Sequence, residues 1–253
     1  MGALHDGHAA LFAAARGRGD TVLATIFVNP RQFSDAADLA AYSRSPEADL
    51  AVAQRGGVDA VAEPALSDMW PDGFATATTV SVAGLGDVWE GEGRPGHFDG
   101  VASVVAKLLV VTGPCRAYFG EKDFQQLVVV RRLVRDLGFD VEVVAGPIVR
   151  DPDDLALSSR NVRLSPAGRI RARALSRAIA LAGAQPAPAS ELRRRMASTL
   201  RDAGVDIAYA EVVDPETLAP TSDDESGPRR ALVAGVVEGV RLIDNGPVTV
   251  REG

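Results

Sequence analysis

A single cysteine, Cys115, and an aromatic content of only 5% stand out in this chain of 253 residues. One cysteine cannot form an internal disulfide framework, which agrees with a reducing compartment. No apolar run is long enough to span a bilayer, and the start shows no signal-peptide pattern. The net charge of −7 argues against a nucleic-acid partner, because phosphate contacts dominate that kind of affinity. We therefore expect a soluble, cytoplasmic protein with neither a membrane nor a nucleic acid as its partner.

Strand-like and helix-like segments alternate through the first part of the chain. Residues 21–28 (TVLATIFV) form a nearly continuous β-rich run, typical of a strand buried on both faces. Ser45-Pro46 and Gly56-Gly57 carry the start and stop signals of a helix. This β–α alternation predicts an α/β fold, with a Rossmann-like, doubly wound parallel sheet over residues 1–149. The expected helices cover residues 7–17, 46–55, 97–111 and 122–137, and the expected strands cover residues 21–28, 58–61, 116–119 and 139–144.

The pattern changes after about residue 149. Two helices are expected there, one starting at Ser165-Pro166 and one capped by Ser190. Three alternating segments follow, and Glu238-Gly239 between the last two is a hairpin signal. These features predict a smaller α+β domain over residues 150–253. The expected strands cover residues 207–213, 230–237 and 240–243, and residues 221–228 are expected to form a solvated loop.

Two of the three histidines, His5 and His8, lie in the first eight residues with Gly7 between them, and an apolar helical run follows. Imidazoles beside a helix N-terminus suit an anion site, since free backbone N–H groups and the helix dipole favour phosphate. A capping and packing pair explains the same residues equally well. A metal site would need a third ligand, which no recognisable spacing supplies. A phosphate-binding turn of an α/β protein is expected to follow a strand, and none precedes this one.

Two further segments place polar side chains in turns. In residues 27–33 (FVNPRQF), the amides of Asn29 and Gln32 follow a strand, and open α/β sheets bind ligands at such strand ends. An ordinary Asn-Pro turn is the alternative. The third histidine, His97, lies in a glycine-rich loop before a helix, so all three histidines share this setting.

Residues 119–126 (FGEKDFQQ) again join a strand end, a glycine and a helix start. Lys122 would neutralise a phosphate as a point charge, and Asp123 would help to hold Mg²⁺ that sits on phosphate oxygens. Gln126 lies one turn after Asp123 on the same side. A solvated helix start explains the acidic residues but not the lysine, which the dipole disfavours. Residues 157–161 (LSSRN) offer hydroxyls and a guanidinium to a polyphosphate, with a polar linker as the alternative.

The segments MGALHDGH, FVNPRQF, RPGHFDGV, YFGEKDFQQL, LALSSRN and RLIDN occur in the order found in one family. Over essentially its whole length the chain resembles the pantoate–β-alanine ligases, which are nucleotidyltransferases with an HxGH signature. The resemblance implies attack of the pantoate carboxylate on the α-phosphate of ATP, giving pantoyl adenylate and diphosphate. The β-alanine amine would then displace AMP and form pantothenate. It also implies Mg²⁺ bound with ATP, no tightly bound cofactor, a homodimer, and a second domain that closes over ATP.

The resemblance also implies roles for individual residues. The catalytic residues would be His8 as proton donor, His5 at the α-phosphate, and Lys122. Pantoate would contact Gln32, Gln126 and Asn29, and β-alanine would contact Gln32. Asp123 would help to hold the Mg²⁺ that is bound with ATP. The implied ATP-binding residues are Met1, Gly2, Ala3, Leu4, His5, Asp6, Gly7, His8, Gly120, Glu121, Lys122, Asp123, Val149, Leu157, Ser158, Ser159 and Arg160.

The chain departs from the family pattern in three places. Asp154 stands where the family has glycine, and aspartate tolerates a positive φ less well than glycine. Leu157 replaces the usual methionine, which is a mild apolar exchange. Family members carry a few dozen residues before this Met1, including a buried strand, so we expect a parallel sheet without its central strand. Two alternative functions remain: a non-catalytic remnant of the enzyme, and a related nucleotidyltransferase with another substrate, against which Gln32 and Gln126 argue.

Overall fold

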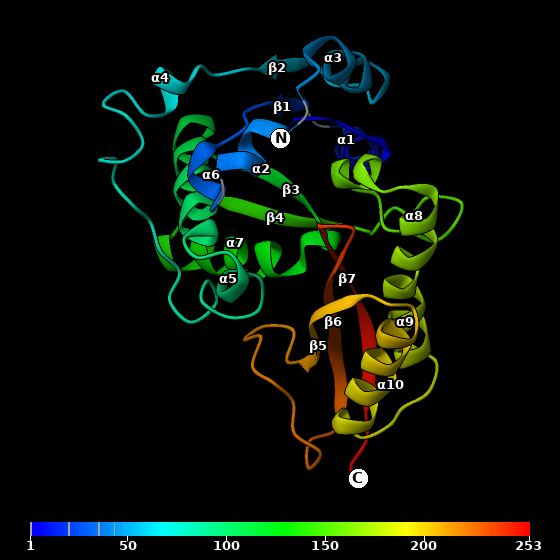
Figure 1. The fold of residues 1–253 in the computed structure, drawn as a ribbon. Helices are drawn as coiled ribbons and strands as arrows, with labels where there is room; N and C mark the ends of the chain where they lie inside the picture. Colours follow the sequence, from blue (N-terminus) through cyan, green and yellow to red (C-terminus); the bar gives the residue numbers. More distant parts are fainter. Residues whose placement is uncertain (1, 20, 35, 43) are drawn as a thin grey trace. The chain divides into compact units, whose positions relative to one another are not determined.

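The structure, a computed structural model, describes residues 2–19, 21–34, 36–42 and 44–253. The chain divides into two compact units (Figure 1). The division into domains 1–149 and 150–253 stays a prediction. The two units differ from it in one respect, because a short segment near residue 123 groups with the later part of the chain. The first unit comprises Met1–Glu121 and Gln125–Pro147, and the second comprises Lys122–Phe124 and Ile148–Gly253.

The strands of the first unit form parallel pairs, as the sequence predicts. β1 (Leu23–Thr25) pairs with β2 (Ala60–Ala62), and β3 (Cys115–Gly120) pairs with β4 (Val141–Gly146). In the part of the chain that the structure describes, these pairs are separate two-stranded sheets. The strand predicted over residues 21–28 is therefore shorter than expected, because a ladder extends only where a neighbouring strand offers its N–H and C=O groups.

The four long helices predicted for this region are confirmed, with small shifts at their ends. The last of them starts two residues late, because residues 121–123 form a 3-10 turn, η2 (Glu121–Asp123). Glycines with positive φ end two of them, Gly113 at 70° and Gly138 at 67°, as helix C-termini favour. The helices are α1 (Asp6–Gly17), α3 (Pro46–Arg55), α6 (His97–Thr112) and α7 (Phe124–Leu137), with shorter α2 (Ala36–Ala41), α4 (Leu66–Met69) and α5 (Glu90–Gly93).

The second unit is an antiparallel sheet with helices packed on it (Figure 1). Its strands are β5 (Asp206–Val213), β6 (Gly227–Val237) and β7 (Val240–Val250), paired in that order. The hairpin predicted at Glu238-Gly239 is confirmed, and both residues have positive φ, 53° and 76°, as a type I′ turn requires. The helices are α8 (Pro166–Ala172), α9 (Ala174–Gly183) and α10 (Ala189–Asp202), preceded by the 3-10 turn η3 (Ser159–Arg163).

Two local predictions for the second unit are corrected. Ser190 does not cap α10, whose N-cap position is Pro188. Instead, the N–H and the hydroxyl of Ser190 both donate to the Asp223 carboxylate, at 2.7 and 2.6 Å. The stretch from residue 221 to 228 is also not simply solvated, since Thr221 is only 2% exposed and Pro228 lies in β6. In both cases, contacts with residues distant in the sequence determine the structure, and the local sequence pattern does not.

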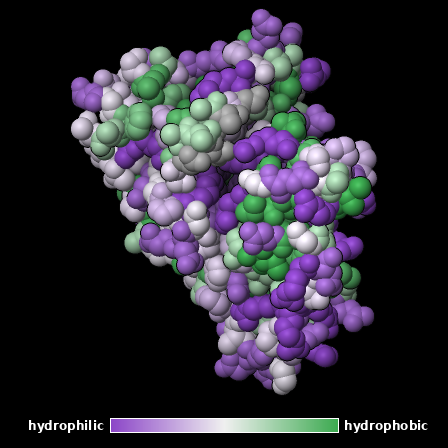
Figure 2. Space-filling model, viewed as in Figure 1, coloured by the Kyte–Doolittle hydropathy of each residue, from purple (hydrophilic) through white to green (hydrophobic). Residues whose placement is uncertain are grey.

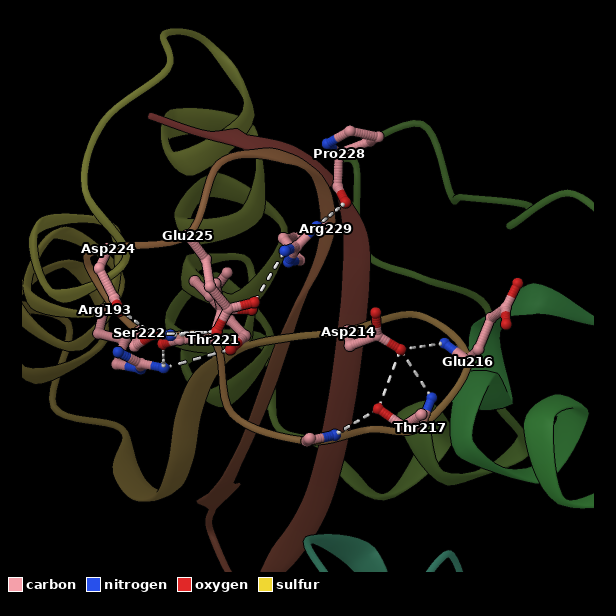
Figure 3. A network of polar contacts seen from close by, with 12 residues as sticks. Arg193, Asp214, Glu216, Thr217, Thr221, Ser222, Asp224, Glu225, Pro228 and Arg229 are labelled. Carbon is pink, nitrogen blue, oxygen red and sulfur yellow. Dashed lines mark hydrogen bonds and ion pairs between the residues drawn. The ribbon is translucent and has the colours of Figure 1, made fainter. Parts of the chain in front are cut away.

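The connection between β5 and β6 is an ordered polar network (Figure 3). Oδ1 of Asp214 accepts from the backbone N–H groups of Glu216 and Thr217, at 2.9 and 2.8 Å. Burial acts to raise the pKa of Asp214, but these hydrogen bonds outweigh it and lower that pKa. The Arg193 guanidinium donates to the carbonyl of Thr221 at 2.5 Å. A loop of 13 residues between the strands is thereby tied to α10.

Each unit has apolar side chains of its own to bury. In the second unit, fully buried residues of α9, α10 and the sheet form one continuous cluster, with Leu192, Met196 and Leu200 at 0% exposure. In the first unit, one cluster lies along α6 and α7 and a smaller one joins α1 to α3. Hydrophilic residues cover most of the face seen in Figure 2, and hydrophobic ones occur on it in smaller groups. Within the described residues, no helix combines the length and apolarity needed to cross a membrane.

Candidate functional site

The two histidines of the opening motif cap the helix that they begin. His5 is the N-cap of α1, and its Nδ1 accepts from the N–H of Gly7 at 3.1 Å. Nδ1 of His8 accepts from the N–H of His5 at 3.2 Å, and the two ring centroids are 4.2 Å apart. An Nδ1 that accepts from a backbone N–H has no proton of its own, so the neutral ring carries its proton on Nε2. The capping interpretation is therefore correct, and it leaves each imidazole with a defined Nε2–H donor.

Gly7 lies against the ring of His5, which folds back over it. A Cβ at position 7 would lie 2.9 Å from both Cε1 and Nδ1 of the His5 ring. Real Cβ atoms essentially never approach other atoms so closely, so a side chain at this position would require the His5 ring to shift. The glycine between the histidines thus belongs to the same device as the cap.

A buried carboxylate that sequence reasoning missed holds the residues before the helix. Asp49 of α3 is 3% exposed and accepts from the N–H groups of Ala3 and Leu4, at 3.0 and 2.6 Å. Ala3 is held at a φ of 50°, a conformation that non-glycine residues rarely adopt. From the sequence alone, Asp49 is recognisable only as an acidic residue in the first turn of a helix, where the helix dipole favours a negative charge. Its real partner lies 46 residues away.

These bonds change how the motif would bind an anion. The sequence predicts free backbone N–H groups there, but those of residues 3, 4, 5 and 7 already donate within the protein. The donors with a defined direction are instead the two imidazole Nε2–H groups. Gly2 lies against Val28, since a Cβ on it would be 3.0 Å from Cγ2 of that valine. The motif is thereby adjacent to the segment after β1 that leads to Asn29, whereas Met1 lies outside the described residues.

The turn that carries Gln32 is fixed from inside the first unit. Asn29 is 1% exposed; its Oδ1 accepts from the N–H of Arg31 at 3.2 Å, and its Nδ2 donates to the carbonyl of Gly100 at 2.9 Å. A Cβ on Gly100 would lie 2.3 Å from the Arg31 carbonyl oxygen, so only glycine lets α6 approach the turn η1 (Pro30–Gln32) this closely. Asn29 thus uses both amide atoms to build the turn, while Gln32 is only half-buried.

His97, the third histidine, stabilises the same turn. It is 8% exposed, and its Nδ1 donates to the carbonyl of Gln32 at 2.7 Å. The Arg94 guanidinium lies 3.2 Å from His97 Nε2 and 3.2 Å from the same Gln32 carbonyl. His97 therefore carries its proton on Nδ1, the opposite nitrogen from His5 and His8. The glycine-rich setting common to all three histidines does not reveal this difference, which depends on partners far along the chain.

The two adjacent glutamines at the start of α7 have different environments. Gln125 is 5% exposed; its amide donates to the carbonyls of Leu85 and Val88, each at 2.8 Å, and accepts from the N–H of Glu90 at 3.1 Å. Gln126 is half-buried on the first turn. The internal role of Gln125 leaves Gln126 as the better candidate for substrate contact, as the resemblance implies.

In the second unit, Lys122 and Asp123 form a charged turn. Nζ of Lys122 lies 3.3 Å from Oδ1 of Asp123, and the two side chains are 20% and 50% exposed. Gly120, the last residue of β3, and Glu121, the first residue of η2, belong to the first unit. Asn245 of β7 donates to the Lys122 carbonyl at 2.8 Å. The charged turn is therefore bonded to the C-terminal strand.

The serine–arginine segment, residues 157–160, follows a short loop whose two arms are hydrogen-bonded to each other. The N–H of Leu157 donates to the carbonyl of Val149 at 3.0 Å, so the Val149 backbone closes this loop. Ser158 caps η3 by accepting from the N–H of Arg160 at 3.2 Å. Ser159 and Arg160 are half-buried on that turn. Asp154 has a φ of 69°, the condition under which the family's glycine matters most.

Arg150 anchors this loop to β7. Its guanidinium forms a bidentate pair with the Asp244 carboxylate, at 2.6 and 2.9 Å, and also donates to the carbonyl of Asp154 at 3.0 Å. The hydrogen bond with Asp244 holds the pKa of Arg150 above its ordinary value. Asp244 and Asn245 belong to the RLIDN segment, to which the sequence assigns no individual role.

A resident metal site is not formed by the described residues, which contain no group of three or more His, Cys, Asp or Glu side chains able to hold an ion. Mg²⁺ does not need one when it arrives with a nucleotide, because it is usually bound by one or two carboxylates together with the phosphates. The half-exposed carboxylate of Asp123 fits that requirement.

The whole arrangement matches a known family. The family model for pantoate-beta-alanine ligase matches residues 1–247. This chain belongs to the pantoate–β-alanine ligase family. The family assignment made from six short segments is thereby confirmed over nearly the whole chain.

Named relatives agree with the family assignment. A pantothenate synthetase of Rhizorhabdus wittichii is 48% identical over 249 residues, covering 97% of this chain and 87% of that protein. A pantothenate synthetase of Thermus thermophilus is 49% identical, covering 97% of this chain and 90% of that protein.

Solved structures of the family share the fold. A crystal structure of pantothenate synthetase from Thermus thermophilus has a TM-score of 0.91 at 50% identity and covers 97% of this chain and 90% of its own. The ligase of Francisella tularensis, complexed with β-γ ATP and β-alanine, has a TM-score of 0.79 at 32% identity and covers 97% and 86%. The predicted α/β class, with parallel strands followed by a smaller antiparallel domain, is therefore confirmed.

Proposed function

We propose that this protein condenses (R)-pantoate with β-alanine at the expense of ATP, releasing pantothenate, AMP and diphosphate through a pantoyl-adenylate intermediate. Full-length similarity to pantothenate synthetases carries the reaction class. ATP use is supported by the Francisella ligase bound to an ATP compound and β-alanine. A carboxylate is a poor acyl donor until adenylation supplies a leaving group, so the enzyme's task is to stabilise charge that develops on phosphate oxygens.

The catalytic residues in this proposal are His8, His5 and Lys122. The caps on α1 hold both imidazoles as Nε2–H donors, which suits hydrogen bonding to a phosphate oxygen. His8 is the proton donor and His5 supports the α-phosphate. Lys122 supplies a positive charge to the same chemistry from the 3-10 turn η2.

The substrate contacts follow from the two turns of the first unit. Gln32 binds pantoate and β-alanine, and Gln126 binds pantoate. Asn29 supports this site by building the turn under Gln32, since its amide is committed internally. The ATP contacts are those implied by the resemblance: Met1 to His8, Gly120 to Asp123, Val149 and Leu157 to Arg160.

The remaining parts of the proposal concern the state of the working enzyme. Mg²⁺ enters with ATP, and the Asp123 carboxylate is its protein contact. The enzyme is a cytoplasmic homodimer built of an ATP- and pantoate-binding domain, residues 1–149, and a second domain, residues 150–253, that closes over ATP. Closure would protect the adenylate from hydrolysis.

The test is an assay of this chain with ATP, Mg²⁺, pantoate and β-alanine. AMP formation should require both organic substrates, and ATP–diphosphate exchange should require pantoate alone, because adenylation is the first step. Exchange that ignores pantoate but responds to another acid would identify a related nucleotidyltransferase. A folded chain without either activity would be a non-catalytic member of the family.

A further inference from the structure

Two adjacent polar residues of β7, Asp244 and Asn245, are buried in the second unit, each at 3% exposure. Buried polar groups are costly unless their hydrogen bonds are satisfied. The proposed function gives neither residue a role. Consecutive strand residues face opposite sides of the sheet, so Asp244 shares its face with apolar Leu242 and Val248 while Asn245 lies on the other face. Their hydrogen-bond partners indicate why the strand carries two buried polar residues here.

Asn245 bonds two other segments of the chain, one of them 123 residues away. Its Nδ2 donates to the main-chain carbonyl of Lys122 at 2.8 Å. Its Oδ1 accepts from Nε of Arg230 at 2.8 Å and from Nη2 of the same guanidinium. The Arg230 guanidinium lies over the Phe124 ring, 4.3 Å from its centroid. The turn is therefore held on both sides of Asp123, at the carbonyl before it and at the ring after it.

Asp244 holds the other phosphate-binding segment of the second unit. Its bidentate pair with Arg150 fixes that residue, which forms a β-bridge with Ala156, two residues before Ser158. Both β7 residues are themselves in register with β6, Asp244 opposite Val233 and Asn245 opposite Leu232. A paired strand is a rigid support, so consecutive residues on it set a fixed relation between the two segments they hold.

We propose that Asn245 is a positioning residue that fixes the direction from which the Lys122 ammonium meets a phosphate of ATP, and that Asp244 fixes the segment carrying Arg160. The bond to the Lys122 carbonyl orients the peptide plane next to the lysine Cα, and with it the direction of the side chain. This inference rests on the proposed function, because that function gives Lys122 and Arg160 their ligand.

The main test replaces Asn245 with aspartate. Asn245→Asp keeps an acceptor for Arg230 but sets an oxygen against the Lys122 carbonyl, so the Lys122 segment is released while the β7 side of the network remains. Misplacement of a catalytic group by about 1 Å can cost on the order of 100-fold, and we expect kcat to fall about 10- to 100-fold. Hydrogen exchange should rise in a peptide covering residues 119–126 and stay unchanged in α9 and α10.

Asp214→Asn is the matched control. Asp214 lies in the same unit and accepts three hydrogen bonds in the network of Figure 3, from two backbone N–H groups and the Thr217 hydroxyl. Loss of its negative charge should weaken these three bonds and lower thermal stability, and kcat at 25 °C should stay within about two-fold of the wild type because none of these three bonds reaches the Lys122 turn. An equal fall of kcat in both variants would mean a general structural effect and would overturn the proposal.

A double-mutant cycle with Lys122→Ala decides whether Asn245 acts through the lysine. Groups that act as a unit are not additive. Asn245→Asp should therefore slow the Lys122→Ala enzyme less than two-fold, and a fully additive loss would contradict the proposed route.

The outcome does not depend on turnover alone. If the wild-type chain forms no AMP, the proposed function fails. A calorimetric titration of the protein with Mg·ATP and the hydrogen exchange of residues 119–126 still test the positioning role. Weaker Mg·ATP binding together with faster exchange in Asn245→Asp supports it. Exchange at the wild-type rate in that segment overturns it, whatever the activity.

Discussion

The two units fix their candidate phosphate-binding side chains by opposite means. In the first unit, His5 and His8 cap their own helix, so hydrogen bonds spanning two or three residues set the tautomer of each ring. In the second unit, Lys122 is held by Asn245, 123 residues away, and the loop before Ser158 is held by the Arg150–Asp244 pair, which spans 94 residues. A local cap forms with its helix, whereas remote anchors exist only when the whole antiparallel sheet has formed.

Because one motif is fixed locally and the other by remote bonds, the elements packed around them have different roles in the two units. The first unit needs its neighbours only to place a preformed motif, which Asp49 does through the N–H groups of Ala3 and Leu4. In the second unit the motif is a three-residue 3-10 turn, and β7 holds it through the bond from Asn245 to the Lys122 carbonyl. Substitutions in the two units should therefore separate effects on chemistry from effects on assembly.

The largest effect is expected at the local cap. His8→Ala removes an Nε2–H donor from the charge that develops in adenylation and should lower kcat by about 10²–10³-fold. It also removes the acceptor for the His5 N–H, so helix stability should fall by about 1 kcal/mol. Pantoate-dependent ATP–diphosphate exchange measures the first effect and thermal unfolding the second. Normal exchange in a folded variant would remove His8 from the catalytic residues.

The next effect tests the close approach of α6 to the Gln32 turn. Gly100→Ala would set a Cβ 2.3 Å from the Arg31 carbonyl oxygen, and neither backbone can yield without moving the turn. We expect the KM for pantoate and for β-alanine to rise about ten-fold or more, since a misplaced contact group loses most of its interaction. Gly17→Ala is the control, because its Cβ would meet nothing within 4 Å. A rise in the KM for ATP alone would show that the turn serves the nucleotide.

Removal of Asp49 tests how the opening motif is placed. Asp49→Ala leaves two backbone N–H groups without their acceptor, at about 1–3 kcal/mol for each that stays buried. Stability should fall and Mg·ATP should bind less tightly, because Ala3 and Leu4 lose their anchor. Glu47→Ala, at an exposed position of the same helical turn, should change neither. Equal behaviour of the two variants in calorimetry would show that Asp49 acts only through the helix dipole.

Acid should destabilise the second unit through two of its hydrogen-bonded carboxylates, Asp153 and Glu238. A hydrogen bond from Arg169 lowers the pKa of Asp153 below its ordinary value of 3.8, and a hydrogen bond from the Ser165 N–H lowers the pKa of Glu238. A carboxyl with a lowered pKa in the folded state stabilises the protein above its ordinary pKa. That contribution is lost as the pH falls through the lowered value. Thermal unfolding measured from about pH 5 downward should show this decline.

Asp153→Asn provides the comparison for the acid experiment. The variant lacks the titrating carboxyl, so its unfolding temperature should decline less steeply with acid than that of the wild type. Parallel curves would mean that the Asp153–Arg169 pair contributes nothing to the pH dependence.

The smallest effect is expected at the departure from the family pattern. Asp154 has a φ of 69°, so Asp154→Gly relieves backbone strain but adds freedom to the unfolded chain, and the net change should stay within about 1 kcal/mol. The variant also lacks a negative charge beside Arg150, so it should bind Mg·ATP slightly more tightly than the wild type. Isothermal titration of the two proteins measures this, and weaker binding by the glycine variant would contradict it.

Much of the fold is predictable because its signals are local. The long helices of the first unit and the turn at Glu238-Gly239 follow from periodicity, glycines and turn chemistry. The predictions that failed depended on distant partners. Serine is a residue type that favours N-caps, but the Ser190 hydroxyl donates to Asp223 instead. The strand predicted over residues 21–28 is limited in length by its short neighbour β2.

The candidate site divides in the same way. The sequence alone determined the family, the order of the segments and the residue types needed for adenylation, because these are written in short contiguous motifs. Only the tertiary structure decided that His97 supports the Gln32 turn, that Asn29 builds this turn, and that Asp49, Asp244 and Asn245 hold the motifs in place. Each of these roles belongs to a hydrogen bond between residues at least 45 positions apart, and no local pattern encodes the partner.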